Sequence, residues 1–233
     1  MPEPGVALVT GAGSGLGAVI AERLGRAGLT VAVNTRSRTG DAEKVVAAIR
    51  AAGGRAFSVA ADVTEPAAVK LMFDAIADHG RVRVLVNNAS YRPRAAFADI
   101  TEEDWRKVHA VTLDGAFSCI RNALPTLIPG GRVVNILGRN ALDGDPQRVH
   151  VSAAKYGLLG LTRALAVSLR SDGVAVNAVS PGIDCEGTDL EHCRDEIAEQ
   201  VARLTVEPTE VTGTVVRVDC DGAGVVSAIT RDY

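Results

Sequence analysis

The sequence predicts an α/β fold, in which a doubly wound, parallel seven-stranded sheet carries helices on both faces. Short apolar runs rich in β-branched residues alternate with longer amphipathic runs from residue 6 to residue 218. The short runs are almost wholly apolar, which is typical of strands that are covered on both sides. Because parallel strands need crossover connections, the longer runs are predicted to be the connecting helices.

The elements alternate in chain order. Strands are predicted at residues 6–9, 30–34, 56–60, 82–86, 132–136, 174–179 and 215–218. Helices are predicted at residues 16–27, 41–52, 66–79, 102–124, 149–169 and 194–204. Gly28 ends the first helix, and Pro66 suits the first turn of the third. We find no linker or internal repeat, so residues 1–233 are predicted to form one domain.

Composition excludes several classes of protein. The 233 residues are enough to bury roughly 70% of the surface of the unfolded chain. Hydrophobic residues make up 47% and charged residues 23%, which is ordinary for a globular protein and excludes a largely disordered one. The net charge of −3 and the 3% of aromatic residues argue against a nucleic-acid partner.

The chain also lacks the signals of export and of membrane insertion. The first five residues, Met1 to Gly5, do not begin a basic and then apolar leader, and no stretch approaches the ~18 apolar residues of a membrane span. We therefore expect a cytoplasmic protein with no membrane partner. The cysteines show neither CxxC nor Cys/His ligand spacing, so no metal site is predicted and reduced thiols are expected; they are Cys119, Cys185, Cys193 and Cys220.

A glycine-rich turn follows the first predicted strand. It reads Thr10-Gly11-Ala12-Gly13-Ser14-Gly15-Leu16-Gly17 and leads directly into a helix. Glycines permit a tight turn and close approach of a pyrophosphate, and the helix N-terminus offers free N–H groups and a favourable dipole. The residues predicted to bind this phosphate group are Gly11, Ser14, Gly15, Leu16 and Gly17.

Further motifs make the resemblance specific. Asp62-Val63 follows the third strand, Asn87-Asn88-Ala89-Ser90 the fourth, and Asn177 to Gly182 the sixth; Thr212-Gly213 and Val218-Asp219 come near the C-terminus. With the spacing TGxxxGxG, these motifs resemble the short-chain dehydrogenase/reductase family over almost the whole chain. The resemblance implies a Rossmann-like fold, a small-molecule substrate and a homodimer or homotetramer. It implies further cofactor contacts from Asp62, Val63, Asn88, Ala89, Pro181, Gly182 and Ile183.

The end of the second strand indicates which nicotinamide cofactor is preferred. An acidic residue there would accept the ribose 2′-OH of NAD, whereas arginine accommodates a 2′-phosphate. The sequence reads Asn34-Thr35-Arg36-Ser37-Arg38, with two guanidinium groups and no acid. Because arginine pairs strongly with phosphate, Arg36 favours NADP(H) over NAD(H). The alternative is that both arginines are solvated loop residues.

The family's catalytic positions are altered. The resemblance implies a tyrosine acid/base, a lysine one turn later, a serine that polarises the carbonyl group and an asparagine that supports a proton relay. Lys155 matches the lysine, but Val151 stands where the tyrosine belongs. Leu137 and Gly138 replace the serine motif, and Thr112 stands at the position of the asparagine. The sequence therefore resembles an atypical member without the Ser-Tyr pair.

Hydride addition to a plain ketone builds an alkoxide, which needs a proton or oriented donors. Without the tyrosine and serine, the candidates for donating a proton are Lys155 itself, His150 and Tyr91. The unperturbed pKa of a histidine lies near neutrality, and Tyr91 lies in the loop after the fourth strand. Their alternative roles are gripping the nicotinamide ribose, starting a surface helix and packing a loop, respectively. Thr112 completes the candidate catalytic set.

Three functions remain open at this stage. The first is an NADP(H)-dependent reductase of altered mechanism, acting on an iminium, a quinone or a conjugated small molecule. The second is a non-redox enzyme such as a cyclase, dehydratase or isomerase, and the third is a catalytically silent partner protein. The substrate lid, at about residues 183–212, is shorter than the family usually has: Gly182 and Gly213 are 31 positions apart. An open pocket, a bulky or carrier-borne substrate, or a site completed by a partner subunit would fit this short lid.

Overall fold

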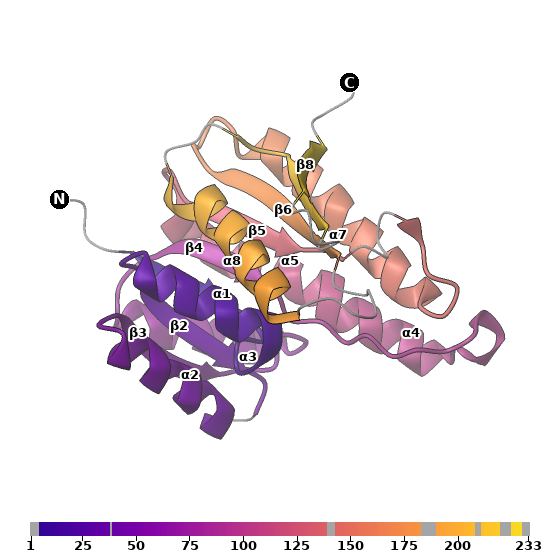
Figure 1. Ribbon diagram of the computed structural model, residues 1–233, viewed down its shortest axis with the longest axis horizontal. Helices are drawn as coiled ribbons and strands as arrows, with labels where there is room; N and C mark the ends of the chain where they lie inside the picture. Colours follow the sequence, from indigo (N-terminus) through magenta and orange to yellow (C-terminus); the bar gives the residue numbers. More distant parts are fainter. Residues whose placement is uncertain are drawn as a thin grey trace.

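Eight strands form a single sheet in the order β3-β2-β1-β4-β5-β6-β7-β8 (Figure 1). The computed structural model describes residues 5–37, 39–138, 143–182, 190–207, 211–219 and 225–229. The strands are β1 (Val6–Val9), β2 (Thr30–Thr35), β3 (Arg55–Ala60), β4 (Val82–Asn87), β5 (Arg132–Ile136), β6 (Ala175–Gly182), β7 (Val215–Asp219) and β8 (Val225–Ile229). β1 to β7 pair in parallel, which confirms the predicted seven-stranded, doubly wound sheet.

The eighth strand was not predicted. β8 pairs antiparallel with β7, from Val215 opposite Ile229 to Asp219 opposite Val225. An antiparallel neighbour needs no crossover helix, so the βα alternation that predicted the other strands carries no signal for this one.

Two layers of helices cover the sheet. The helices are α1 (Gly15–Arg26), α2 (Thr39–Ala51), α3 (Pro66–Ala77), α4 (Glu102–His109), α5 (Gly115–Leu127), α7 (Val149–Ser168) and α8 (Leu190–Val206). Ala7 and Val9 of β1 pack in the layer of α1, α2 and α8, whereas Val6 and Leu8 pack with α3, α5 and α7. This alternation is the period of two that a strand buried on both faces requires.

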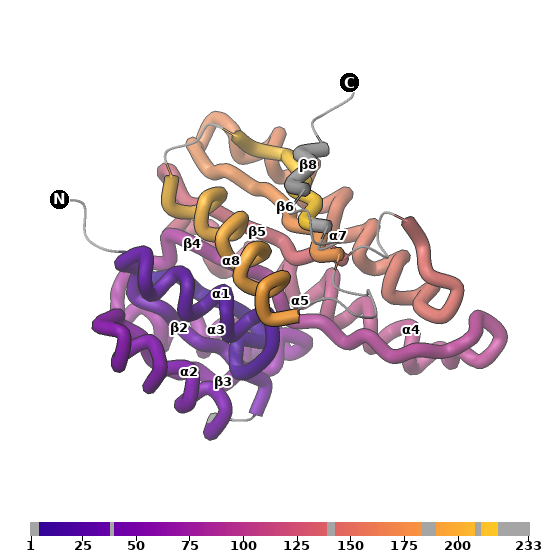
Figure 2. Tube along the Cα trace, viewed as in Figure 1, coloured from indigo at the N-terminus to yellow at the C-terminus, as the bar shows by residue number. Residues whose placement is uncertain are grey.

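Residues that are distant in sequence are joined within the first layer. Figure 2 shows α8 running beside α1. Arg23 Nε of α1 donates a hydrogen bond to Glu199 Oε2 of α8 at 2.7 Å. Arg23 and Arg203 both lower the pKa of the Glu199 carboxyl group, chiefly through the hydrogen bond from Arg23. The C-terminal part of the chain thus returns to the helix that follows the glycine-rich turn.

The long helix predicted at residues 102–124 is interrupted. The structure divides it into α4, a π-helical turn at Ala110–Asp114 and α5. A π-helical turn inserts an extra residue and shifts the register of the side chains that follow it. One inserted residue hardly changes the spacing of apolar residues, so the sequence pattern predicted one continuous helix.

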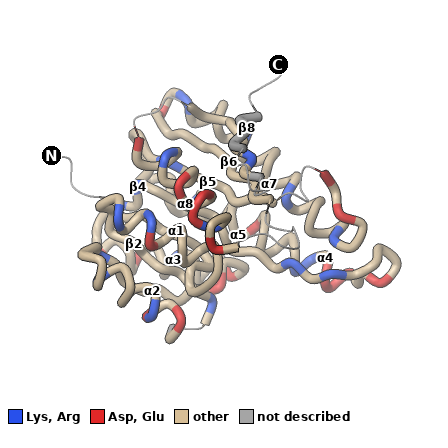
Figure 3. The backbone as a smooth tube through the Cα atoms, in the orientation of Figure 1, with Lys and Arg blue, Asp and Glu red and all other residues tan. Residues whose placement is uncertain are grey.

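Helix α4 has the charge distribution that stabilises an exposed helix. Its N-cap Thr101 accepts a hydrogen bond from Asp104 N at 3.0 Å. Acidic side chains lie in its first turn and basic ones in its last, which matches the helix dipole. Figure 3 shows both signs of charge along this helix.

A chain of buried amide and hydroxyl groups fixes the centre of the sheet to α7. Asn87 Nδ2 in β4 donates to Asn135 Oδ1 in β5 at 2.9 Å, and Asn135 Nδ2 donates to Thr162 Oγ1 in α7 at 2.9 Å. All three side chains are buried, so their hydrogen bonds replace lost contacts with water. This network holds α7 against the carboxyl half of the sheet, where the candidate site lies.

Three expectations from the sequence, about membrane spans, cysteines and metal ligands, can be compared with the described residues. No described helix is long and apolar enough to cross a membrane. Cys119 is a free, buried thiol, and loss of hydration raises its pKa to about 12. Cys193 is disulfide-bonded, so the expectation of a reduced thiol is wrong at this position. Within the described ranges, no group of His, Cys, Asp and Glu residues is arranged to hold a metal ion.

Candidate nucleotide-binding active site

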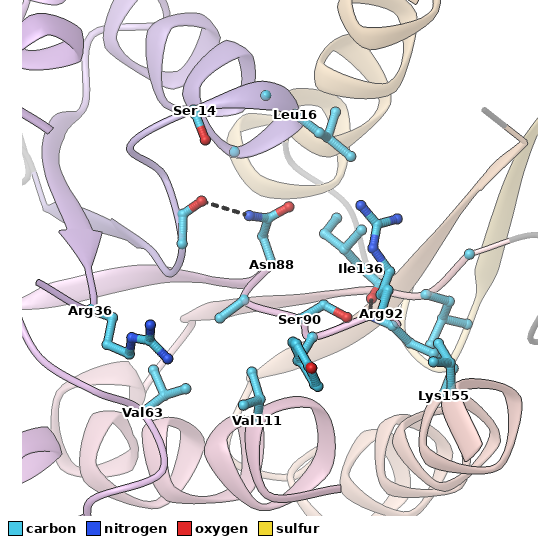
Figure 4. A pocket seen from close by; sticks show the side chains of 18 of the residues that line it. Ser14, Leu16, Arg36, Val63, Asn88, Ser90, Arg92, Val111, Ile136 and Lys155 are labelled. Atoms are coloured by element: carbon cyan, nitrogen blue, oxygen red, sulfur yellow. Dashed lines mark hydrogen bonds between the residues drawn. The ribbon is translucent and has the colours of Figure 1, made fainter. Parts of the chain in front are cut away.

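A cavity of about 610 Å³ opens at the carboxyl edge of the parallel strands (Figure 4). This edge is where open α/β sheets bind ligands. The cavity brings together segments that are far apart in sequence. Thirteen of the predicted site residues line it: Gly11, Ser14, Gly15, Leu16, Gly17, Arg36, Asp62, Val63, Asn88, Ala89, Tyr91, Lys155 and Pro181. Gly182 ends β6 beside Pro181 and is buried, and Ile183 lies outside the described residues.

The glycine-rich turn is held tightly against the end of β4. Asn88 Nδ2 donates to Thr10 O at 2.9 Å and to Gly11 O at 3.1 Å, and the Thr10 hydroxyl accepts from Asn88 N and Ala89 N at 3.0 and 3.1 Å. A Cβ atom on Gly17 would lie 2.5 Å from Asn88 Nδ2 and 2.6 Å from Gly11 O. The close approach of these segments therefore requires glycine at position 17.

The turn also leaves hydrogen-bond donors available. Gly11 has φ 63° and Gly15 has φ 58°, a backbone region that other L-residues rarely adopt. Ser14 caps the N-terminus of α1 without a side-chain hydrogen bond to the helix. The first N–H groups of α1 consequently face the cavity without a capping side chain, and they fit the pyrophosphate of a dinucleotide.

The far end of the cavity, which we call the adenosine end, contains residues that the sequence analysis assigned to the cofactor. Arg36 follows β2 and Val63 follows β3, and both line the cavity. Asp62 is the only carboxylate in the described lining, and its Oδ1 accepts hydrogen bonds from Thr64 N and Thr64 Oγ1 at 3.0 and 2.8 Å. The exposed Arg36 follows β2, and within the described residues no carboxylate ends that strand. Arg38 lies outside the described residues.

The other end of the cavity is dominated by one buried amine. Lys155 Nζ, on α7, donates a hydrogen bond to Ile136 O at the end of β5 at 2.6 Å. Burial, and to a smaller extent the nearby positive charge of Arg92, lowers the pKa of Lys155 to about 7. An amine with this pKa exchanges its proton near neutral pH.

The side chains around Lys155 are largely apolar. Val151, one turn earlier on α7, is 3% exposed and packs with Val108 and Ala154. Leu137 and Gly138 continue the lining after β5. Tyr91 packs against the Val151 cluster, and Lys107 Nζ lies 4.7 Å from the centroid of its ring. The described hydroxyl groups of the lining belong to Ser14, Ser90 and Tyr91.

The chain is similar to known proteins over most of its length. Residues 5–196 match the family model for short chain dehydrogenases. The chain belongs to the short-chain dehydrogenase family. The 3-oxoacyl-[acyl-carrier-protein] reductase FabG of Staphylococcus epidermidis is 33% identical over 231 residues, which cover 96% of this chain and 95% of that one. The 3-oxoacyl-[acyl-carrier-protein] reductase of Synechocystis is 37% identical over 216 residues, covering 90% of this chain and 87% of the relative.

Two solved structures are also similar to this chain. A dehydrogenase/reductase from Sinorhizobium meliloti superposes with a TM-score of 0.86 at 32% identity, covering 92% of this chain and 93% of that one. The angucycline C-6 ketoreductase LanV, whose structure has bound NADP, superposes with a TM-score of 0.84 at 29% identity and covers 91% of this chain and 93% of that one. The chain is therefore a short-chain dehydrogenase in both sequence and fold.

Two candidates of the sequence analysis lie outside the lining of this short-chain dehydrogenase's cavity. His150 is completely buried, and neither ring nitrogen has a hydrogen-bond partner among the described residues. The pKa of its imidazole is lowered, chiefly by burial and also by the charge of His109, although the charge of Asp104 acts in the opposite direction. Thr112 is buried in the π-helical turn, and its Oγ1 lies 3.5 Å from Ser90 Oγ, which lines the cavity. Thr112 therefore reaches the site only through Ser90.

The structure adds three basic residues that the sequence analysis did not assign to the site. Lys107 from α4, Arg148 at the start of α7 and Arg194 from α8 all line the cavity. Lys107 is four residues before Val111, which also lines the cavity. Residues with this spacing share one face of a helix, so the spacing could have indicated that Lys107 lines the cavity. Arg194 was placed at the start of a predicted helix, but local sequence does not reveal that α8 returns to the cavity.

Proposed function

We propose that this short-chain dehydrogenase is an NADP(H)-dependent oxidoreductase in which Lys155, and not a tyrosine on α7, serves the reacting end of the site. The observation that carries the proposal is the position of Lys155. Its amine is buried at one end of the cavity, against Ile136 O, and the side chains of the neighbouring Val151 and Leu137 carry no polar group. When bound, NADPH would supply the hydride for reduction.

The preference for NADP(H) is supported by Arg36 and by one relative. Arg36 lines the adenosine end of the cavity, and no carboxylate ends β2 to accept a ribose hydroxyl. LanV, a neighbour in fold and sequence, has bound NADP. The pyrophosphate would lie at the N-terminus of α1, where Gly11, Gly15 and Gly17 allow its approach.

Lys155 would hold and deliver a proton. An ammonium has three N–H groups, of which one binds Ile136 O. The lowered pKa, about 7, makes proton transfer to a substrate easier than from an ordinary lysine. Donation to a developing anion leaves a neutral amine, which burial favours.

The substrate class follows from the missing hydroxyl donors. Reduction of an iminium ion develops no alkoxide, and a quinone or a conjugated system spreads the new charge over several atoms. Both need less help from an enzyme acid than a plain ketone does. Val151 and Leu137 are consistent with such a substrate, because neither side chain can donate a hydrogen bond.

Cofactor binding is the first test. Titration with NADPH and NADH, followed by calorimetry, should show tighter binding of NADPH. Arg36→Gln should weaken NADPH binding about 10- to 100-fold and leave NADH binding nearly unchanged, because a charge-assisted bond to the 2′-phosphate is lost. Equal loss for both cofactors would contradict the role of Arg36. Absence of any nucleotide binding would remove the redox proposal and leave a non-redox enzyme or a silent partner.

Turnover is the second test. The wild type should oxidise NADPH with quinone, iminium or conjugated substrates, and only slowly with a 3-oxoacyl thioester. Val151→Tyr should gain activity on the thioester, whereas Val151→Phe, which adds the same ring without the hydroxyl, should not. Rapid wild-type reduction of the thioester would refute the altered mechanism. Product formed equally well without NADP(H) would instead indicate a cyclase, dehydratase or isomerase.

A further inference from the structure

Two unpaired cations stand at the reacting end of the cavity. Arg92 belongs to the loop after β4 and Lys107 to α4, and both line the cavity together with Lys155. Within the described part of the chain, neither side chain makes a hydrogen bond or an ion pair with a carboxylate. Lys107 instead lies over the ring of Tyr91, with Nζ 4.7 Å from the centroid.

The two cations lie close to the apolar cluster beside Lys155. Tyr91 packs against Val151 and Val108, so Lys107, above its ring, is beside the same cluster. Arg92 is the next residue after Tyr91, and its charge is close enough to Lys155 to lower the pKa of that amine. Figure 4 shows Arg92 and Lys155 on the same side of the cavity, away from Arg36.

These charges are not balanced locally. Asp62 is the only carboxylate in the described lining; it lies with Val63 at the adenosine end, and Thr64 occupies its Oδ1. The phosphates of the cofactor have their own partners in the proposed function, which are the N-terminus of α1 and Arg36. Arg92, Lys107 and Lys155 line the same cavity, and their mutual repulsion would be reduced by an anion that enters it.

We propose that the substrate carries an anionic group, a carboxylate or a phosphate, which Arg92 and Lys107 bind while its apolar part rests on Tyr91 and Val151. This inference rests on the proposed function, because it names the class of substrate for the same site. Arg92 offers a planar set of N–H donors and Lys107 a point charge, which together suit a small anionic group. The anion would also offset the charge that Arg92 places beside Lys155.

The test measures binding and needs no turnover. Benzoate and benzamide have nearly the same shape and differ in charge, and phenylphosphonate replaces the carboxylate by a phosphate-like group. Each is titrated by calorimetry into the full chain with and without saturating NADP⁺. Benzoate should bind at least about tenfold more tightly than benzamide, because charge-assisted bonds form only with the anion. Comparison of benzoate with phenylphosphonate shows which anion is preferred.

Variants of the two cations test whether they cause the preference for benzoate over benzamide. Arg92→Gln and Lys107→Gln should each remove most of the preference for benzoate over benzamide, and both side chains are exposed, so folding should be unaffected. Arg170→Gln is the matched control, because this exposed arginine lies just beyond the opposite end of α7. The preference should persist in Arg170→Gln and decrease as salt is added.

Three results would overturn the inference. These are equal binding of benzoate and benzamide, no detectable binding of benzoate, or a preference that both variants retain. If instead Arg92→Gln and Lys107→Gln weaken NADP⁺ binding and leave the benzoate preference unchanged, the two cations serve the cofactor. Failure of the proposed function is separately visible, since the protein would then not bind NADP⁺ at all while the titrations without cofactor still report on the anion.

Discussion

Lys155 affects both the proposed chemistry and the stability of the protein. Its amine is buried, and its single described partner is the carbonyl oxygen of Ile136. Burial without a carboxylate favours the neutral amine over the ammonium. The same displacement of the pKa that prepares Lys155 for proton transfer also makes the folded state sensitive to pH.

Stability should rise with pH above neutrality because of this residue. The pKa of Lys155 is about 7 in the folded protein, against an ordinary value of 10.5 in an unfolded chain, so the unfolded chain binds more protons between these values. The free energy of unfolding therefore increases as pH rises from about 7 towards 10, and this gain is absent below pH 7. Urea unfolding of apoprotein at pH 7 and 9 should show a larger increase for the wild type than for Lys155→Met. An identical pH dependence would show that Lys155 titrates normally.

Activity should show the opposite trend. The ammonium form of Lys155 is the proton donor, so kcat for reduction should fall as pH rises through about 7. Lys155→Arg keeps a positive charge at every pH, and its remaining activity should lose this decline. Steady-state rates measured from about pH 5.5 to about pH 9, with a quinone that is stable over this range, would reveal the decline. A decline unchanged in Lys155→Arg would assign the proton to another group.

At the scale of elements, the site depends on the joint between the glycine-rich turn and the end of β4. Two hydrogen bonds from Asn88 Nδ2 and two to the Thr10 hydroxyl join these segments. The joint leaves no room for a side chain at Gly17. Close contact with Asn88 and Gly11, and not the backbone conformation at position 17, therefore requires glycine there.

Gly17→Ala should weaken both cofactor binding and folding. Its methyl group would displace Asn88 Nδ2 and Gly11 O, so NADPH affinity should fall at least about tenfold and stability by ~1–3 kcal/mol. Gly160→Ala is the matched control, because nothing lies within 4 Å of a Cβ atom at that position in α7. It should leave affinity unchanged and raise stability by up to about 1 kcal/mol. Calorimetry and urea unfolding measure both quantities, and a tolerant Gly17→Ala would contradict the tight joint.

At the scale of the whole molecule, several apolar side chains are exposed on α4, α5 and α7. Phe117 on α5 is 51% exposed, and Val167 on α7 is 70% exposed. Trp105 on α4 and Tyr156 on α7 are also exposed. An apolar surface on adjacent helices suits a symmetric contact with a second copy of the chain.

The expected homodimer or homotetramer can be tested on this surface. The double variant Phe117→Asp, Val167→Asp should sediment as a smaller species than the wild type, because burying two carboxylates in an apolar contact is costly. Val206→Asp, on α8 in the other layer, is the control and should keep the oligomeric state. Analytical ultracentrifugation distinguishes the species. A wild-type monomer, or an unchanged assembly in the double variant, would exclude this contact.

The sequence by itself determined the parallel order of alternating strands and helices, the phosphate-binding turn and the place of Lys155. These features depend on local patterns: an apolar run, a helical period, or a glycine that permits a particular backbone conformation. Their association with one edge of the sheet follows from the rule that parallel strands share a carboxyl edge.

Only the tertiary structure decided which other side chains reach that edge. His150 belongs to the same helix as Lys155 but is buried outside the cavity lining, and Lys107 and Arg194 enter the lining from α4 and α8. The π-helical turn and β8 also depend on packing between distant segments. The spacing of apolar residues shows which face of a helix or strand is buried. Which charged side chains line one cavity depends on how separate helices and strands are placed in space.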